Sequence, residues 1–117
     1  MDRLLEDARR DLDRVEPEDL AAEVAAGALV VDIRPSETRV PEGELPGALV
    51  VDRNVLEWRL DPTSDARLPE ADPDRRVILV CNEGYASSLA AETLQRVGLR
   101  RATDLVGGYR AWRALHP

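Results

Sequence analysis

Several residue types are absent from this sequence or nearly so. The chain of 117 residues has no phenylalanine and no lysine, one cysteine, one histidine, two tryptophans and two tyrosines. A core must therefore be built from Leu, Val and Ala, which dominate the 44% of hydrophobic residues. The absence of lysine excludes every lysine nucleophile, and a single cysteine excludes an internal disulfide.

Long apolar runs and an excess of positive charge are also lacking. The longest uncharged apolar run, residues 24–31, is far shorter than the ~20 residues that a membrane span needs. The net charge of −7 argues against nucleic acid or a membrane as partner. Nothing at the start of the sequence resembles an export signal, so we expect a reducing cytoplasm, where a lone thiol stays free.

Hydrophobic patterning predicts one α/β domain. Short apolar runs typical of buried strands lie at residues 29–33, 48–51, 77–80 and 102–106. Helical patterns lie between and after them, with a short helix near residues 55–59 inside a long polar loop. This alternation predicts a mainly parallel sheet, whose sites lie at the carboxyl ends of the strands.

The N-terminal segment is charged and has its own helical periodicity. Leu5, Ala8 and Leu12 recur at helical spacing, which predicts an amphipathic helix over residues 3 to about 13. We assign residues 1–14 to this N-terminal helix and residues 15–117 to the main domain. A packed cover is the simpler interpretation of the helix, and docking or dimerisation is the alternative.

The single cysteine, Cys81, directly follows the strand at 77–80. A short polar loop with Gly84 comes next, then Ser87, Ser88 and a helical run. Such a turn aims backbone N–H groups at one point, and the helix dipole favours an ionised thiol there. A buried, inert cysteine is the alternative, but this loop suits an anion better than a packed core. We therefore predict a nucleophile at Cys81.

Four motifs in order resemble those of a single-domain rhodanese-like sulfurtransferase. They are Val31-Asp32-Ile33-Arg34, Gly43-Glu44-Leu45-Pro46-Gly47-Ala48, the loop Cys81-Asn82-Glu83-Gly84-Tyr85-Ala86, and Leu105-Val106-Gly107-Gly108-Tyr109-Arg110-Ala111-Trp112. The resemblance implies a central, mainly parallel five-stranded sheet with helices on both faces. It also implies a catalytic Cys81 that carries a persulfide, with Asp32 and Arg34 as buried structural support. The family's substrate pocket would be lined near Asn54, Trp58 and Arg59, although a tryptophan or arginine there could equally be a solvated surface residue.

The implied reaction moves one sulfur atom in two halves. The Cys81 thiolate takes the sulfane sulfur of thiosulfate or of a persulfide donor, and a thiol or a cyanide-type acceptor, protein thiols included, removes it. The resulting anion would be stabilised by the loop amides, namely those of Asn82, Glu83, Gly84, Tyr85, Ala86 and Ser87. This chemistry needs no metal and no organic cofactor, and His116, the only histidine, is expected in a solvated tail.

The sequence also departs from the family pattern. Glu44 stands where a histidine is usual, and the cysteine loop lacks the arginine that many members carry. Related phosphatases use a longer loop closed by an arginine, so the short loop argues against phosphate as substrate. Glu83 beside the thiolate predicts weak activity on dianionic thiosulfate. Ser87 and Ser88 are expected to cap the following helix, or else to bond the persulfide.

Two other functions remain open at this stage. A binding module would keep the fold for recruitment and leave the cysteine incidental. A redox sensor would use Cys81 to form a sulfenic acid with peroxide.

Overall fold

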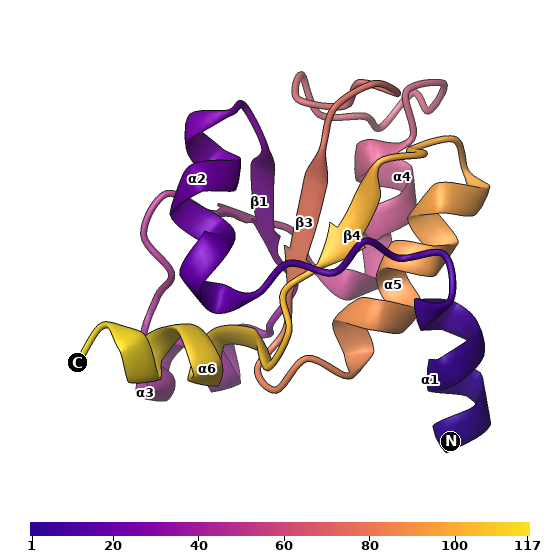
Figure 1. The fold of residues 1–117 in the computed structure, drawn as a ribbon. Coiled ribbons are helices and arrows are strands. Elements are labelled where there is room, and N and C mark those ends of the chain that lie inside the picture. The colour runs from indigo at the N-terminus through magenta and orange to yellow at the C-terminus, as the bar shows by residue number, and fades with distance from the viewer.

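The computed structural model describes all 117 residues, which form a four-stranded sheet and six α-helices (Figure 1). The strands are β1 Leu29–Asp32, β2 Leu49–Val50, β3 Val77–Val80 and β4 Ala102–Asp104. The helices are α1 Asp2–Arg9, α2 Leu20–Ala25, α3 Ser36–Glu42, α4 Leu56–Leu60, α5 Ala86–Arg96 and α6 Gly108–Leu115, with 3₁₀ turns η1 at Pro17–Asp19 and η2 at Arg53–Val55. All strands run parallel in the order β2-β1-β3-β4, so the predicted α/β class is confirmed. These helices are too short and too polar for any of them to span a bilayer.

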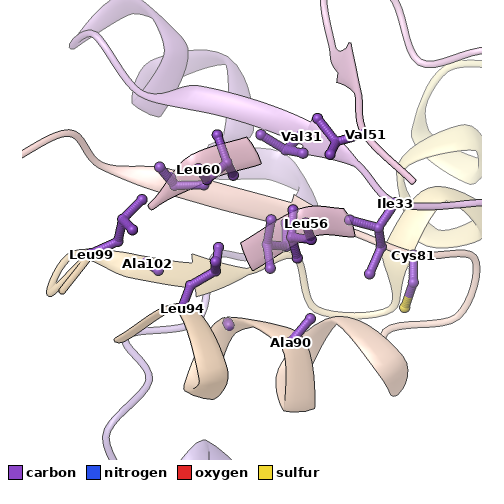
Figure 2. Packing of buried hydrophobic residues seen from close by; sticks show 13 residues of the cluster. Val31, Ile33, Val51, Leu56, Leu60, Cys81, Ala90, Leu94, Leu99 and Ala102 are labelled. Carbon is purple, nitrogen blue, oxygen red and sulfur yellow. The ribbon is translucent and has the colours of Figure 1, made fainter. Parts of the chain in front are cut away.

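The sheet is buried on both faces, which explains the continuous apolar character of β1 and β3. Val31 and Leu79 are paired in register and face α4 and α5, where the larger core cluster lies (Figure 2). Their neighbours Val30 and Ile78 belong to a second cluster under α2 and α6. Helices therefore cover both faces, as expected, and the successive apolar residues of β1 and β3 divide between the two clusters.

The expected fifth strand is not formed, so the five-stranded sheet is a wrong prediction. Beyond β4 the ladder continues for one residue only, at an isolated bridge between Val15 and Leu105. Val15 N donates to Asp104 O at 3.0 Å, and Val106 N donates to Val15 O at 2.8 Å. Pro17 then starts a 3₁₀ turn, and because proline has no N–H and a fixed φ, the strand pairing ends there.

The N-terminal helix is shorter than its periodicity predicts. It ends at Arg9, and the chain then turns so that Leu12 packs on the core and Val15 reaches β4. Ala8 is buried, and α1 packs against α5 (Figure 1). This turn carries Arg9 and Arg14 toward the carboxyl end of the sheet.

Candidate active site

Cys81 lies immediately after β3, at the carboxyl end of the sheet, and is 8% exposed. The chain turns at Gly84, whose φ of 88° lies in the left-handed region, and then enters α5. A Cβ on Gly84 would sit 2.7 Å from the backbone nitrogen of Gly107, so glycine is required for its conformation and for its close neighbour. The turn bends the loop around the sulfur atom.

Three groups of the loop contact the sulfur. The backbone nitrogens of Gly84 and Ser87 donate to Cys81 Sγ at 3.1 and 3.3 Å, and Ser87 Oγ lies 3.2 Å from it. The N–H groups of Glu83, Tyr85 and Ala86 have no hydrogen-bond partner within the chain. With the N-terminus of α5 beside it, this loop can stabilise negative charge on the cysteine and on a sulfur atom attached to it.

Three carbonyl groups of the same loop, those of Cys81, Asn82 and Gly84, are bonded by other parts of the chain. Tyr109 N in the first turn of α6 donates to Cys81 O at 2.8 Å, and Arg110 N donates to Asn82 O at 3.1 Å. On the other side, Arg9 and Arg14 both donate to the carbonyl oxygen of Gly84. The loop therefore keeps its carbonyl oxygens bonded away from the sulfur.

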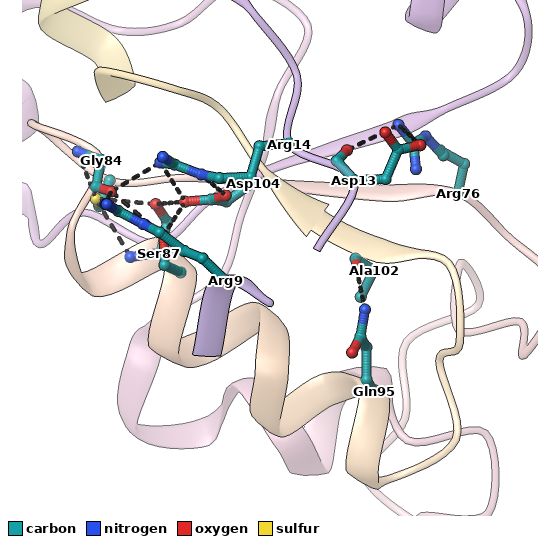
Figure 3. A network of polar contacts seen from close by, with 11 residues as sticks. Arg9, Asp13, Arg14, Arg76, Gly84, Ser87, Gln95, Ala102 and Asp104 are labelled. Carbon is teal, nitrogen blue, oxygen red and sulfur yellow. Dashed lines mark hydrogen bonds and ion pairs between the residues drawn. The ribbon is translucent and has the colours of Figure 1, made fainter. Parts of the chain in front are cut away.

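Asp104 is a residue of the site that sequence reasoning missed. It ends β4 and is fully buried, and its carboxylate accepts hydrogen bonds from Ser87, Ser88 and Arg14 (Figure 3). The sequence did contain a sign of this role, namely an aspartate inside the apolar run 102–106. Aspartate is rare in buried strands unless its carboxylate has partners.

The two serines do not cap α5, contrary to expectation. Tyr85 holds the N-cap position without a side-chain bond, and Ser87 and Ser88 lie inside the first turn, both fully buried. Their hydroxyls donate to Asp104 Oδ2 at 2.7 and 2.8 Å instead. A capping hydroxyl accepts a hydrogen bond from an unpaired amide of the first helical turn. Here the two hydroxyls donate to a buried carboxylate instead.

Asp32 and Arg34 form a separate ion pair at the end of β1. Arg34 Nη2 donates to Asp32 Oδ2 at 2.8 Å, and both side chains are 1% exposed. The guanidinium also donates to Gly43 O at 2.9 Å and lies 4.0 Å from the ring centroid of Tyr109. The pair joins β1 to the start of the 43–48 motif and to α6, and it makes no contact with Cys81.

The three pocket candidates are not brought to the cysteine. Trp58 is 60% exposed on α4. Arg59 donates to Ala66 O at 2.6 Å, which directs its side chain to the polar loop after α4. Asn54 lines a polar cleft with Ile33 and Arg34. The depression at Cys81, of about 240 Å³, is instead lined by the loop itself, namely by Cys81, Asn82, Glu83, Tyr85 and Ala86.

A larger apolar cleft of about 530 Å³ lies between α2 and α6 and shares no residue with the cysteine depression. Trp112 is half-buried and lines this cleft. The titratable residues that line the cleft are Glu18 and His116. The exposed ring of His116 stacks on that of Trp112. Chemistry on sulfur is better supported at the smaller depression, which holds the thiol.

The rim of the depression carries acidic groups with one arginine between them. Arg110 donates to Glu42 Oε2 at 2.8 Å and lies 3.7 Å from the carboxylate of Glu83, which is 58% exposed. The hydrogen bonds from Arg110 hold the pKa of Glu42 below its usual value; partial desolvation opposes this, and a bond from Asn82 adds to it. The same pairing raises the pKa of Arg110. The carboxylate of Glu83 thus lies exposed to water beside the opening.

The chain thus combines a parallel α/β sheet with a cysteine loop at the carboxyl edge of that sheet. The family model of the rhodanese-like domain matches residues 16–115, and the chain belongs to this family. A thiosulfate sulfurtransferase GlpE of Stutzerimonas stutzeri is 31% identical over 92% of this chain and 90% of the relative. A second, from Pseudomonas fluorescens SBW25, is 34% identical over 89% and 87%. Within its family the chain therefore belongs with the sulfurtransferase enzymes.

Solved structures agree on the fold. A protein of unknown function from Rhodopseudomonas palustris, described as a possible tyrosine phosphatase, superposes with a TM-score of 0.87 at 30% identity, over 97% of this chain and 88% of that one. The human single-domain sulfurtransferase TSTD1 superposes with a TM-score of 0.68 at 25% identity, over 86% and 95%. The description of the human protein as a sulfurtransferase agrees with the names of the GlpE relatives. The description of the Rhodopseudomonas palustris protein names phosphatase chemistry instead.

Proposed function

We propose that this protein transfers a sulfane sulfur through a persulfide on Cys81. The observation that carries the proposal is the pair of backbone amides, those of Gly84 and Ser87, that donate to Cys81 Sγ, with Ser87 Oγ 3.2 Å from the same sulfur. The unpaired N–H groups of Glu83, Tyr85 and Ala86 supply further donors for a sulfur atom one bond farther out.

The reaction has two displacements on sulfur. The Cys81 thiolate attacks the outer sulfur of thiosulfate or of a persulfide, and the S–S bond of the donor breaks with its electron pair leaving on sulfite or on a thiolate. An acceptor nucleophile, a thiolate or a cyanide-type anion, then attacks the terminal sulfur, and the Cys81 thiolate leaves. The acceptor class includes protein thiols. A reducing cytoplasm is the compartment that keeps Cys81 free for this cycle.

Mass spectrometry after donor treatment tests the proposal. Treatment with thiosulfate or with glutathione persulfide should add one sulfur atom, about 32 Da, at Cys81, and subsequent cyanide should remove it. Cys81→Ser should show neither change and no transfer of sulfur. No added sulfur on folded wild-type protein would favour a binding module, and faster reaction with peroxide than with either donor would favour a redox sensor.

The likeness to a possible tyrosine phosphatase gives a second chemistry to weigh. The segment from Cys81 to Ser87 contains no arginine, and Arg9 and Arg14 bond the outward carbonyl of Gly84. A phosphate in the depression would lack the bidentate guanidinium partner that holds its oxygens. We expect no turnover of p-nitrophenyl phosphate, and turnover that disappears in Cys81→Ser would contradict the sulfur assignment.

The charge of Glu83 bears on the choice of donor. A carboxylate at the opening repels a dianion more than a neutral or singly charged persulfide, while water and Arg110 weaken this effect. Glu83→Gln should therefore raise kcat/KM for thiosulfate by about two- to fivefold and leave that for a persulfide donor nearly unchanged. Equal thiosulfate turnover by wild type and Glu83→Gln removes the electrostatic argument.

A further inference from the structure

Two arginines that precede the family match contact the cysteine loop. Arg9, the last residue of α1, donates to Gly84 O at 2.9 Å, and Arg14, just before Val15, donates to the same oxygen at 3.1 Å (Figure 3). The matched region starts at residue 16, so both side chains come from outside it. Figure 3 shows both guanidinium groups reaching the loop beside Ser87 and Asp104.

The contact with Gly84 O affects the direction of the next amide. In a trans peptide the C=O and N–H groups point in opposite directions, and this chain has no cis peptide bond. Holding the carbonyl of Gly84 toward the arginines therefore directs the N–H of Tyr85 the opposite way, within the same peptide plane. That N–H has no partner in the chain, so it is free for a bound anion.

The arginines also set the charge behind the sulfur. Arg14 Nε donates to Asp104 Oδ1 at 2.8 Å, and Arg9 Nε donates to the hydroxyl of Ser88 at 2.9 Å. The Arg14 guanidinium thus pairs directly with the buried carboxylate, and that of Arg9 is linked to it through Ser88, whose hydroxyl donates to Asp104 Oδ2. Without them, Asp104 would place an uncompensated negative charge behind Cys81 and disfavour a second negative charge on the sulfur.

Ser87 connects this charge cluster to the sulfur. Its hydroxyl hydrogen is directed to Asp104 Oδ2 at 2.7 Å, and its oxygen lies 3.2 Å from Cys81 Sγ. When the thiol loses its proton, the Ser87 hydroxyl can turn toward the thiolate, provided that Asp104 keeps enough other donors. Arg14 and Ser88 are those donors.

We propose that Arg9 and Arg14 are positioning residues of the sulfur site, which orient the Gly84–Tyr85 peptide and offset the charge of Asp104 so that Cys81 is held as a thiolate and as a persulfide. This role rests on the proposed sulfur transfer. It makes the N-terminal segment a functional part of the enzyme in addition to a packed cover.

Alkylation of Cys81 tests the proposal without requiring sulfur transfer. On the full chain at about pH 7, Arg9→Gln and Arg14→Gln should slow reaction with iodoacetamide by about three- to tenfold, the effect of losing a charge-assisted hydrogen bond. The rate ratio of anionic iodoacetate to neutral iodoacetamide should also fall in both variants. Arg14→Lys should recover part of the ratio because it keeps the charge.

Arg10 provides the matched control. It neighbours Arg9 but pairs with Asp7 on the exposed surface, so Arg10→Gln should alkylate as wild type does. If the rate and the reagent ratio of Arg9→Gln equal those of Arg10→Gln, the proposal is overturned. Should Arg14→Gln fail to fold, Arg9→Gln decides alone, since Arg9 makes no ion pair with a carboxylate.

The same variants separate the two proposals. If alkylation changes as expected but donors add no sulfur to wild-type Cys81, sulfur transfer is refuted and the arginine role stands. If donors add sulfur to wild type and to all variants alike, with unchanged alkylation, the arginine role is refuted and sulfur transfer stands.

Discussion

Two buried carboxylates, Asp32 and Asp104, end the strands on either side of β3, and each pairs with an arginine. The Asp32 pair is made by residues two positions apart and is 1% exposed on both sides. The Asp104 pair joins residues 90 positions apart, and Arg14 remains 19% exposed. Only the Asp104 pair reaches Cys81, through Ser87. One pair supports the fold, and the other connects the fold to the sulfur.

The largest effects are expected when the aspartate of each pair is replaced, and they should differ between the pairs in unfolding free energy and in alkylation of Cys81. Asp32→Asn leaves Arg34 buried without its anion and should cost about 3–5 kcal/mol of unfolding free energy, with unchanged alkylation per folded molecule. Asp104→Asn should cost less, because Arg14 can turn toward water. It should speed alkylation by iodoacetate, since a negative charge near the sulfur is removed. Urea unfolding and alkylation kinetics measure both, and equal alkylation of the two variants contradicts the distinction.

Removing one hydroxyl should have an intermediate effect. Ser87→Ala should cost about 1 kcal/mol and slow alkylation about two- to fivefold, because the hydroxyl that can turn to the thiolate is lost. Ser88→Ala is the matched control, since Ser88 bonds Asp104 at a similar distance but has no bond to Cys81. Ser88→Ala should lose a similar amount of unfolding free energy to Ser87→Ala, and its alkylation rate should change less. A reversed order of the two alkylation rates rules out the connection through Ser87.

The smallest effect is expected at the rim, where Glu42 pairs with the half-exposed Arg110. The pKa of Glu42 is lowered chiefly by its hydrogen bonds from Arg110, so its contribution to stability is present at neutral pH and is lost as pH falls through that lowered pKa. Glu42→Gln should be slightly less stable than wild type at pH 7. The difference should shrink below the ordinary glutamate value of about 4.3. A difference that stays constant from pH 7 to pH 3 would show that the charge is not its cause.

The same contrast explains what the sequence could predict. The strands, the position of the cysteine loop and the closeness of Asp32 to Arg34 were accessible because each is encoded by neighbouring residues, an apolar run or a short motif. The partners of Asp104 lie 16, 17 and 90 positions away, so no local pattern announces them. Ser87 and Ser88 were assigned to capping because local rules weigh only nearby amides.

Two further differences have the same origin. The expected fifth strand was taken from the family resemblance, and Pro17 shortens it to a bridge at Val15. The pocket candidates Asn54, Trp58 and Arg59 were assigned by their position after a strand. Arg59 is bonded instead to the loop that follows α4.

The outward carbonyls of the cysteine loop are held by α6 on one side and by Arg9 and Arg14 on the other. Helix α6 on one side, and α1 with the following Arg14 on the other, consequently hold the seven-residue segment from Cys81 to Ser87 in place. Shortening either helix, or fusing a bulky partner to it, should therefore change the reactivity of a thiol that neither helix contains.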